Sequence, residues 1–215
     1  EKGTARQATL DSKYWWDKFN EKALGKMIVP IEILNQVRMA RNVLELHPLS
    51  SHLWDVSEKQ VVLSGESDKL HPSGKMIQAK GMLDLLPQHG SMIVDGVEID
   101  LTRTVVDLKQ CHNCSHYGMT KAIMTFQYHM KLSWYLNLLQ ASGETQRDTA
   151  ILIFQNSKDP YDVHVRVLSP KDLERGRAQY IHRIDLMQRI SSENIPALFD
   201  NDASTIELPE WSKGE

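Results

Sequence analysis

Asp107 and Lys109 stand two positions apart in the stretch VVDLKQC, residues 105–111. The surrounding β-branched and apolar residues are typical of a buried strand, in which residues i and i+2 point to the same face. The acid and the lysine therefore share one face of the predicted strand. They can form an ion pair at the rim of a half-exposed sheet, or they can serve a chemical site. The spacing alone does not decide, because Asp11 and Lys13 also show it.

A second acid, Asp84, lies upstream in KGMLDLLP, between two leucines. An acid in an apolar strand is costly unless it is paired or bound to a metal. Magnesium is usually held by one or two carboxylates together with water and substrate phosphate. A lysine beside such a metal can position or deprotonate the attacking water and offset phosphate charge, as in metal-assisted phosphodiester hydrolysis. Asp84, Asp107 and Lys109 thus predict a Mg²⁺ site, with Mn²⁺ as a substitute, and a charged sheet rim is the alternative.

Composition sets broad limits on function. The 215 residues suffice for one domain with a real core, and the content of 41% hydrophobic and 25% charged residues is that of a globular protein. No apolar run approaches the roughly 18 residues of a membrane span, so we expect no membrane partner. The net charge of −3 requires any DNA-binding face to be a local patch. The opening EKGTARQ lacks methionine, as expected of a piece of a longer polypeptide or a trimmed one.

Cys111 and Cys114 are the only cysteines in the sequence, which excludes a disulfide framework of the kind found in small secreted proteins. The run CHNCSH contains metal-ligand residue types. Its cysteines and histidines lie too close along one chain to wrap a tetrahedral zinc ion easily. We therefore favour two free thiols over a zinc site, and a reducing cytoplasm is the simplest location.

Strand and helix patterns alternate along the chain and must position the candidate residues. Helical spacing after Pro30 continues to LELHPLSSHLW, which breaks and restarts the helix. Strand patterns fill residues 60–109, divided by the turn signals HPSG, PQHG and DG. We expect helix over most of residues 117–142, then two strands around the turn KDPY, and a final helix over about residues 170–191.

The two ends of the sequence have weaker patterns. We expect the aromatic opening YWWDKFNEKALGKM to form a short helix or a docking arm, and the tail IPALFDNDASTIELPEW to be irregular. The order helix, strands, helix, two strands, helix predicts an α/β or α+β fold with a mixed sheet.

An acid on one strand, followed some tens of residues later by (D/E)-x-K on the next, resembles the pattern of the PD-(D/E)XK nuclease superfamily. KGMLDLLP followed by VVDLKQ is similar to its RecE-type branch, the phage and prophage exodeoxyribonuclease VIII group. LELHPLSSHLW and DPYDVHVRVLSPKDLERGR also resemble that branch. The resemblance implies a restriction-endonuclease-like core, a central mixed sheet flanked by helices, over residues 30–211. An N-terminal arm of residues 1–29 and a tail of residues 212–215 would flank this nuclease domain.

The same branch has Y-x-x-Q-x-x-x-Y on the helix after the lysine strand, and Tyr128, Lys131 and Tyr135 fall in that register. The resemblance implies that Lys131 and Tyr135 line the active site, although a tyrosine on an apolar helix can also only pack in the core. Lys131 stands where the family has glutamine. A lysine there either contacts a phosphate or repels Lys109 and impairs catalysis.

Further metal ligands are less clearly indicated. The backbone carbonyl of Leu108 and the carboxylate of Glu66, on an earlier strand, are candidates, and an exposed strand-edge acid is the alternative for Glu66. Some members of the family place a histidine ligand on the upstream helix. His47 and His52 are the nearest candidates here, and a structural role at the helix break is the alternative.

The resemblance implies a Mg²⁺-dependent exonuclease that hydrolyses duplex DNA ends, 5′ to 3′, in phage-type homologous recombination in the cytoplasm of a bacterial host cell. A single-strand annealing protein would receive the product strand, and the enzyme would form a homo-oligomeric ring. The alternative is a catalytically weak or inactive DNA-binding or assembly module of the same fold.

Overall fold

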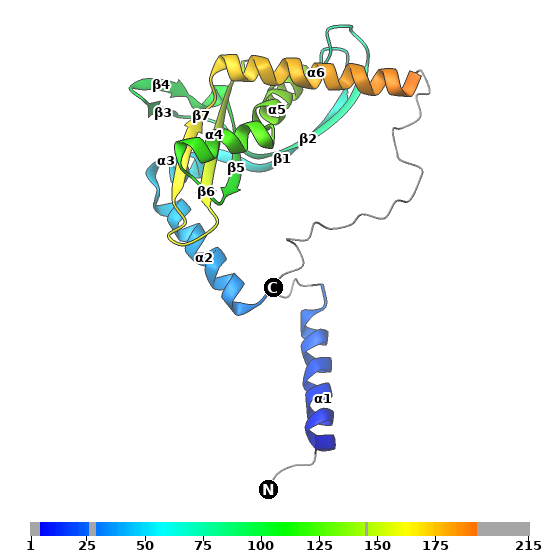
Figure 1. The fold of residues 1–215 in the computed structure, drawn as a ribbon, viewed down its shortest axis with the longest axis vertical. Coiled ribbons are helices and arrows are strands. Elements are labelled where there is room, and N and C mark those ends of the chain that lie inside the picture. The colour runs from blue at the N-terminus through cyan, green and yellow to red at the C-terminus, as the bar shows by residue number, and fades with distance from the viewer. Residues whose placement is uncertain (1–4, 26–28, 145, 193–215) are drawn as a thin grey trace, which may run out of the picture.

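The computed structural model describes residues 5–25, 29–144 and 146–192. Its α-helices and strands follow the predicted alternation (Figure 1). The helices are α1 (Ala5–Ala23), α2 (Ile31–Leu46), α3 (Pro48–Asp55), α4 (His116–Thr125), α5 (Tyr128–Ser142) and α6 (Pro170–Ser192). The strands are β1 (Ser57–Ser67), β2 (Ile77–Pro87), β3 (Ser91–Val94), β4 (Val97–Asp100), β5 (Thr104–Cys111), β6 (Thr149–Asn156) and β7 (Val163–Val167).

Five strands form one central sheet in the order β1-β2-β5-β6-β7. β5 and β6 are parallel, and the other neighbouring pairs are antiparallel, so the predicted mixed sheet is confirmed. The short β3 and β4 form a separate hairpin. Asp95 and Gly96 make its turn with positive φ values of 50° and 78°, as the DG signal predicted, because such tight hairpin turns need φ above zero at both central residues.

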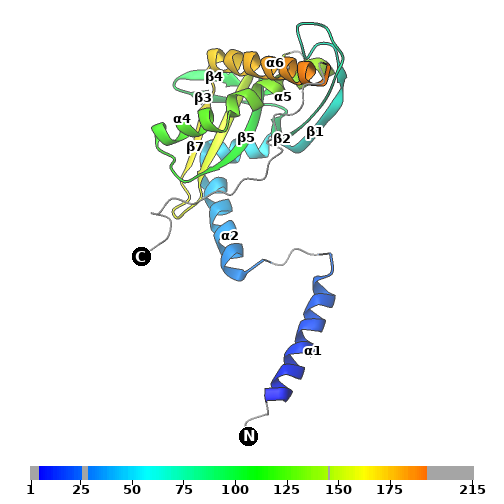
Figure 2. The ribbon, with the colours of Figure 1, turned by 45° about the vertical axis from the view of Figure 1, so that its right-hand side comes forward.

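The sheet is covered on both faces. One core joins the sheet to α4, α5 and α6, and a second joins it to α3, to the β3–β4 hairpin and to apolar residues of α2. The interior strand β6, between β5 and β7, is apolar on both sides, since each residue from Ala150 to Phe154 is buried, as expected of a strand packed on both faces. In both views α6 lies beside α5, while α1 stands apart from the sheet (Figures 1 and 2). None of the described helices is both long enough and apolar enough to cross a membrane.

The long helix expected over residues 117–142 is two helices, and this part of the prediction is corrected. α4 ends at Thr125, and Gln127 adopts a left-handed backbone with φ of 54° before α5 begins. The side chains on either side of it, Phe126 and Tyr128, stack with ring centroids 5.6 Å apart. The sequence has neither glycine nor proline at this point, so it gives no sign of the break.

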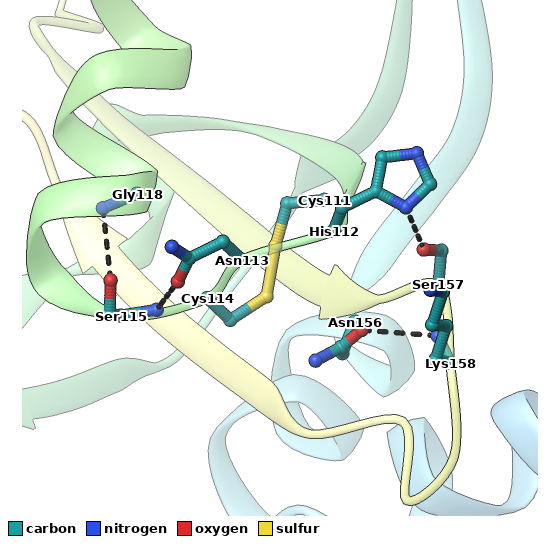
Figure 3. Close-up of a disulfide and its surroundings, with 9 residues drawn as sticks. All are labelled: Cys111, His112, Asn113, Cys114, Ser115, Gly118, Asn156, Ser157 and Lys158. Atoms are coloured by element: carbon teal, nitrogen blue, oxygen red, sulfur yellow. Dashed lines mark hydrogen bonds between the residues drawn. A yellow bond between two sulfur atoms is a disulfide. The ribbon is translucent and has the colours of Figure 1, made fainter.

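Cys111 and Cys114 form a disulfide, so the prediction of two free thiols is wrong (Figure 3). Cys111 ends β5, and a tight turn returns the chain before α4, which brings the two Cα atoms to 6.1 Å, within the range that a disulfide spans. Asn113 and Ser115 hold this turn: the Ser115 N–H donates to Asn113 Oδ1, and Ser115 Oγ caps α4 by accepting from the Gly118 N–H. Spacing alone could not show how closely the turn would bring the sulfurs together.

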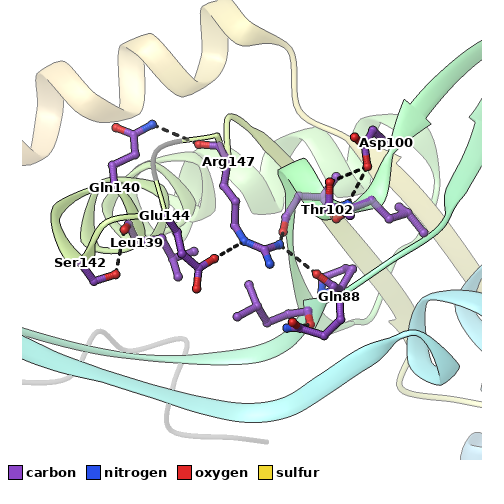
Figure 4. Close-up of polar contacts among 12 residues, drawn as sticks. Gln88, Asp100, Thr102, Leu139, Gln140, Ser142, Glu144 and Arg147 are labelled. Atoms are coloured by element: carbon purple, nitrogen blue, oxygen red, sulfur yellow. Dashed lines mark hydrogen bonds and ion pairs between the residues drawn. The ribbon is translucent and has the colours of Figure 1, made fainter.

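Arg147 fastens the strands that carry the two candidate acids (Figure 4). Its Nη1 donates to the carbonyl of Pro87, at the end of β2, at 3.0 Å, and to that of Thr104, at the start of β5, at 2.7 Å. Its Nε donates to Glu144 at 2.6 Å. The guanidinium is buried, and a buried cation needs such partners. Arg147 thus joins β2 to β5 near their candidate acids. The predicted irregular tail lies outside the described residues.

Candidate active site

Asp84 and Asp107 meet across the β2–β5 pair. The two antiparallel strands pair at Leu85 and Val106. Asp84 and Asp107 are the next residues of their strands, on the same side of that pair. Asp107 is fully buried, whereas the Asp84 side chain is 33% exposed. The carboxyl groups lie close enough to influence each other's protonation. Asp107 is therefore an interior group, whereas Asp84 is partly accessible to solvent.

β2 departs from regular alternation at Asp84. Leu83 and Leu85 lie two positions apart but pack into different cores. The pairing of β2 with β1 leaves out Asp84, and the residue across from it, Gln60, has a left-handed φ of 53°. Instead the Asp84 carboxylate accepts a hydrogen bond from the Leu108 N–H at 2.9 Å. The irregularity thus turns the acid toward β5.

Lys109 completes the cluster from β5. Its ammonium pairs with Asp107 Oδ2, lies 4.0 Å from Asp84 Oδ2 and donates to the Leu108 carbonyl at 3.1 Å. It also lies 5.2 Å from the ring centroid of Tyr128. The expectation that Asp107 and Lys109 share one face agrees with this geometry, and the acid is interior rather than at an exposed sheet rim.

α5 adds a second lysine. Lys131 Nζ lies 3.1 Å from Asp107 Oδ1 and 5.2 Å from the ring centroid of Tyr135. Tyr135 is buried in the core between α5 and the sheet. Since Tyr128 contacts Lys109, the structure brings Tyr128, Lys131 and Tyr135 to the sheet side of α5, as their spacing predicted. Lys131 contacts a carboxylate here, a third possibility besides the phosphate contact and the repulsion of Lys109 considered from the sequence.

The environment moves the pKa values of the two acids in opposite directions. Burial and the adjacent Asp107 carboxyl raise the pKa of Asp84. Burial alone would raise the pKa of Asp107 as well, but the hydrogen bond with Asp84 and the charges of Lys109 and Lys131 lower it. Burial disfavours the Lys131 cation, yet the Asp107 carboxylate and Tyr135 raise the pKa of Lys131. Asp107 is thus held as the anion, and Asp84 is the acid that protonates first.

Three other candidates are not brought to this cluster. Glu66 lies six positions along β1 from Gln60 and accepts a hydrogen bond from Gln78 at 2.9 Å. His47 caps α3, with Nδ1 3.3 Å from the Ser50 N–H, and His52 Nε2 lies 3.1 Å from the Ser91 carbonyl. Glu66 therefore remains a strand-edge acid, and both histidines have structural contacts.

The cluster has the donor chemistry of a hard cation. The carboxylates of Asp84 and Asp107 and the carbonyl of Leu108 are oxygen donors, the kind that Mg²⁺ prefers. Among the residues that the structure describes, no three or more His, Cys, Asp or Glu side chains gather into a metal site. The protein would thus provide a small oxygen set and leave other positions for water or phosphate.

A cleft of about 810 Å³ opens beside Asp84. Asp84 and Leu108 form one part of its lining, together with Leu85 of β2 and Ile153 of β6, and residues of α2, α3 and β1 form the rest. Trp54 and Lys59 also line this cleft, and neither could be identified from the sequence, because they follow no spacing pattern that identifies a site. The structural role of the buried Arg147 could not be predicted either, since the sequence around a single arginine in a loop does not indicate which backbone carbonyls it contacts.

No protein-family model and no curated protein sequence matches this chain. Among solved structures, the chain is similar to one described as "Putative exonuclease" from Eubacterium rectale, with a TM-score of 0.54 and 13% sequence identity, covering 97% of this chain and 78% of that one. A second, SSO0001, has a TM-score of 0.36 and 16% identity over 83% of this chain and 70% of that one, a score too low to imply shared topology. The first likeness concerns the fold alone: the chain shares the mixed α/β fold of that structure.

Proposed function

We propose that this chain is a metal-dependent deoxyribonuclease that hydrolyses phosphodiester bonds at the ends of duplex DNA. The observation that carries the proposal is the convergence of Asp84, Asp107 and Lys109 from adjacent strands beside a cleft. The structural likeness to a protein described as an exonuclease supports the same class of reaction.

The residues divide the work between binding and positioning. Asp84, Asp107 and the Leu108 carbonyl would hold Mg²⁺, or Mn²⁺ in its place. When bound, this ion supplies charge stabilisation at the scissile phosphate and promotes ionisation of water. Lys109, close to both acids, positions the attacking water and offsets the negative charge that develops on the phosphate. Tyr135 packs behind Lys131 and fixes its position.

A second candidate function follows from Lys131. Its ammonium lies against Asp107 Oδ1, an oxygen that the metal ion would need. With Lys109 on Oδ2, both oxygens of this carboxylate already face a cation. If Lys131 stays paired with Asp107 Oδ1, this oxygen cannot bind the metal ion. The arrangement then favours a catalytically weak or inactive DNA-binding or assembly module.

The finer parts of the proposal rest on the resemblance of the sequence to the RecE-type branch. These are 5′-to-3′ polarity, a role in phage-type recombination in a bacterial cytoplasm, a single-strand annealing partner and assembly into a ring. Each has its own measurement: end labelling for polarity, co-purification with an annealing protein for the partner, and light scattering for the assembly.

The decisive experiment is a digestion assay on linear duplex DNA with and without Mg²⁺, using closed circular DNA as the substrate that lacks ends. Mg²⁺-dependent loss of the linear substrate alone, abolished by Asp107→Ala, is the expected result. DNA binding by wild type without Mg²⁺- or Mn²⁺-dependent digestion would instead favour the inactive module. Digestion that survives in Asp107→Ala would exclude this cluster as the active site.

A further inference from the structure

The cleft beside Asp84 has an aromatic wall. Trp54, in the last turn of α3, lines it and is 50% exposed. Trp15 and Trp16 of α1 are also exposed, so exposure alone does not distinguish Trp54. Its position does, because the same cleft is lined by Asp84 and Leu108 of the candidate site.

Lys59 accompanies this tryptophan. Its ammonium lies 5.5 Å from the ring centroid of Trp54, and it lines the same cleft from β1. It makes no ion pair within the described part of the chain, whereas Arg41, also in the lining, pairs with Glu45 at 2.7 Å. The wall therefore offers an aromatic surface with an adjacent cation that pairs with no carboxylate among the described residues.

The size of the cleft suits a small ligand. About 810 Å³ lies within the roughly 300–1,000 Å³ of pockets that enclose small molecules. A base with its sugar and phosphate fits such a volume, whereas B-form duplex does not, because the major groove of the duplex alone is about 12 Å wide. Only a nucleotide released from the stack can enter.

We propose that the cleft binds one unpaired nucleotide of the DNA end, with its base stacked on Trp54 and its phosphate beside Lys59. This inference rests on the proposed function, because it places that nucleotide next to the bond to be cleaved. Proteins that bind single-stranded nucleic acid without sequence preference use such aromatic platforms, since every base has a π-face. Trp54 therefore determines which end structure the enzyme accepts, an unpaired or easily frayed one.

The charges of the lining favour base stacking over a site for phosphate alone. Two cations and three acids line the cleft: Arg41, Lys59, Glu45, Asp55 and Asp84. A site built for phosphate would carry an excess of cations. Stacking is less sensitive to salt than phosphate contacts are, so the contribution of Trp54 persists at salt concentrations that weaken that of Lys59.

The test uses linear duplex DNA with 2-aminopurine as the terminal base and phosphorothioate linkages that resist hydrolysis. Stacking on Trp54 quenches the fluorescence of 2-aminopurine, and titration with wild type in Mg²⁺ gives an affinity. We expect Trp54→Leu to lose the quenching and to bind about 5- to 150-fold more weakly, which corresponds to roughly 1–3 kcal/mol per stacked base. Trp54→Phe keeps an aromatic face and retains most of both signals.

The matched control is Trp16→Leu, the same substitution at a tryptophan that is 60% exposed on α1, away from the cleft. It should behave as wild type, and circular dichroism checks that all variants are folded. Equal quenching and affinity for Trp54→Leu, Trp16→Leu and wild type would overturn the inference, as would the absence of binding by wild type. Digestion of unmodified DNA is measured in parallel. Normal digestion without a Trp54-dependent signal removes the nucleotide subsite alone, whereas a Trp54-dependent signal without digestion supports the subsite and removes the nuclease proposal.

Discussion

Asp107 is a buried anion whose two oxygens each face a lysine. We expect Asp107→Asn to keep a similar shape but to lose nearly all hydrolysis, because a neutral amide oxygen holds Mg²⁺ far more weakly than a carboxylate does. A fall in initial rate on linear duplex to below a tenth of wild type, a barrier increase of at least about 1.4 kcal/mol, is the expected result. Glu66→Gln is the matched control, since it removes one carboxylate charge on the same sheet outside the cluster. An active Asp107→Asn would remove Asp107 from the site.

Lys131 tests the choice between the two proposed functions. We expect Lys131→Gln to keep measurable activity and to bind Mg²⁺ more tightly, because it frees Asp107 Oδ1. Lys131→Glu should lose nearly all activity, because it places an anion against Asp107 and the scissile phosphate. Initial rates across a salt series and calorimetric Mg²⁺ titrations measure both effects. Equal rates for the three proteins would place Lys131 outside the active site, and a large gain for Lys131→Gln over a nearly inert wild type would favour the inactive module.

At the scale of elements, Arg147 joins β2 to β5 through two carbonyl hydrogen bonds. Lysine keeps the charge but lacks the forked guanidinium that reaches both carbonyls. We expect Arg147→Lys to lower the free energy of unfolding by about 1.5–3 kcal/mol, the value of a hydrogen bond to a charged group. Arg103→Lys is the control, because its ion pair with Asp148 is exposed to solvent, where such pairs contribute little to stability. Equal losses in urea unfolding for the two variants would contradict this role of Arg147.

The disulfide joins β5 to the turn before α4, close after Lys109. Replacing both cysteines with serine should lower the free energy of unfolding by about 2 kcal/mol, because a short cross-linked loop restricts the unfolded chain only modestly. We expect digestion rates to stay within about twofold of wild type, since neither sulfur contacts the acids or lysines of the cluster. Urea unfolding with and without reductant measures the effect. A reductant that destabilises wild type but not the double variant confirms the cause, and loss of digestion in the folded double variant would contradict the prediction.

Patterns of single elements were readable from the sequence, and contacts between elements were not. The DG turn, the helix restart at Pro48 and the shared face of Asp107 and Lys109 follow from local rules of backbone geometry. The left-handed Gln127 and the closing of the disulfide depend on how a turn packs against its neighbours. A sequence read by spacing alone therefore indicates the acids and the lysine but not the cleft beside them.

At the scale of the whole molecule, folding, protonation and metal binding are linked through Asp84. Its pKa is raised in the folded state, so without metal its contribution to stability is present at low pH and is lost as the pH rises through the window between the unfolded value, about 3.9, and the raised one. The pKa of Asp107 is lowered, so its contribution is lost as the pH falls through that lowered value. The two windows lie on opposite sides of the unfolded value, so on account of these two acids metal-free stability is greatest near that value and falls as the pH rises through the raised pKa of Asp84.

Added Mg²⁺ opposes this fall in stability at higher pH, because it binds only deprotonated carboxylates of the folded chain. We expect Mg²⁺ to raise the Tm of wild type by an amount that grows as the pH rises through the pKa of Asp84, reaching about 2.7 kcal/mol of stabilisation at a hundredfold excess over Kd. Thermal unfolding with and without Mg²⁺ over about pH 4 to 7 measures it. Asp84→Asn and Asp107→Asn should show almost no Mg²⁺ shift, whereas Glu66→Gln should match wild type. An Mg²⁺-induced Tm shift of equal size in Asp84→Asn would mean that the ion binds elsewhere, and so would a wild-type shift that shrinks with rising pH. Only a site that contains the Asp84 carboxylate must release its proton to take up the metal.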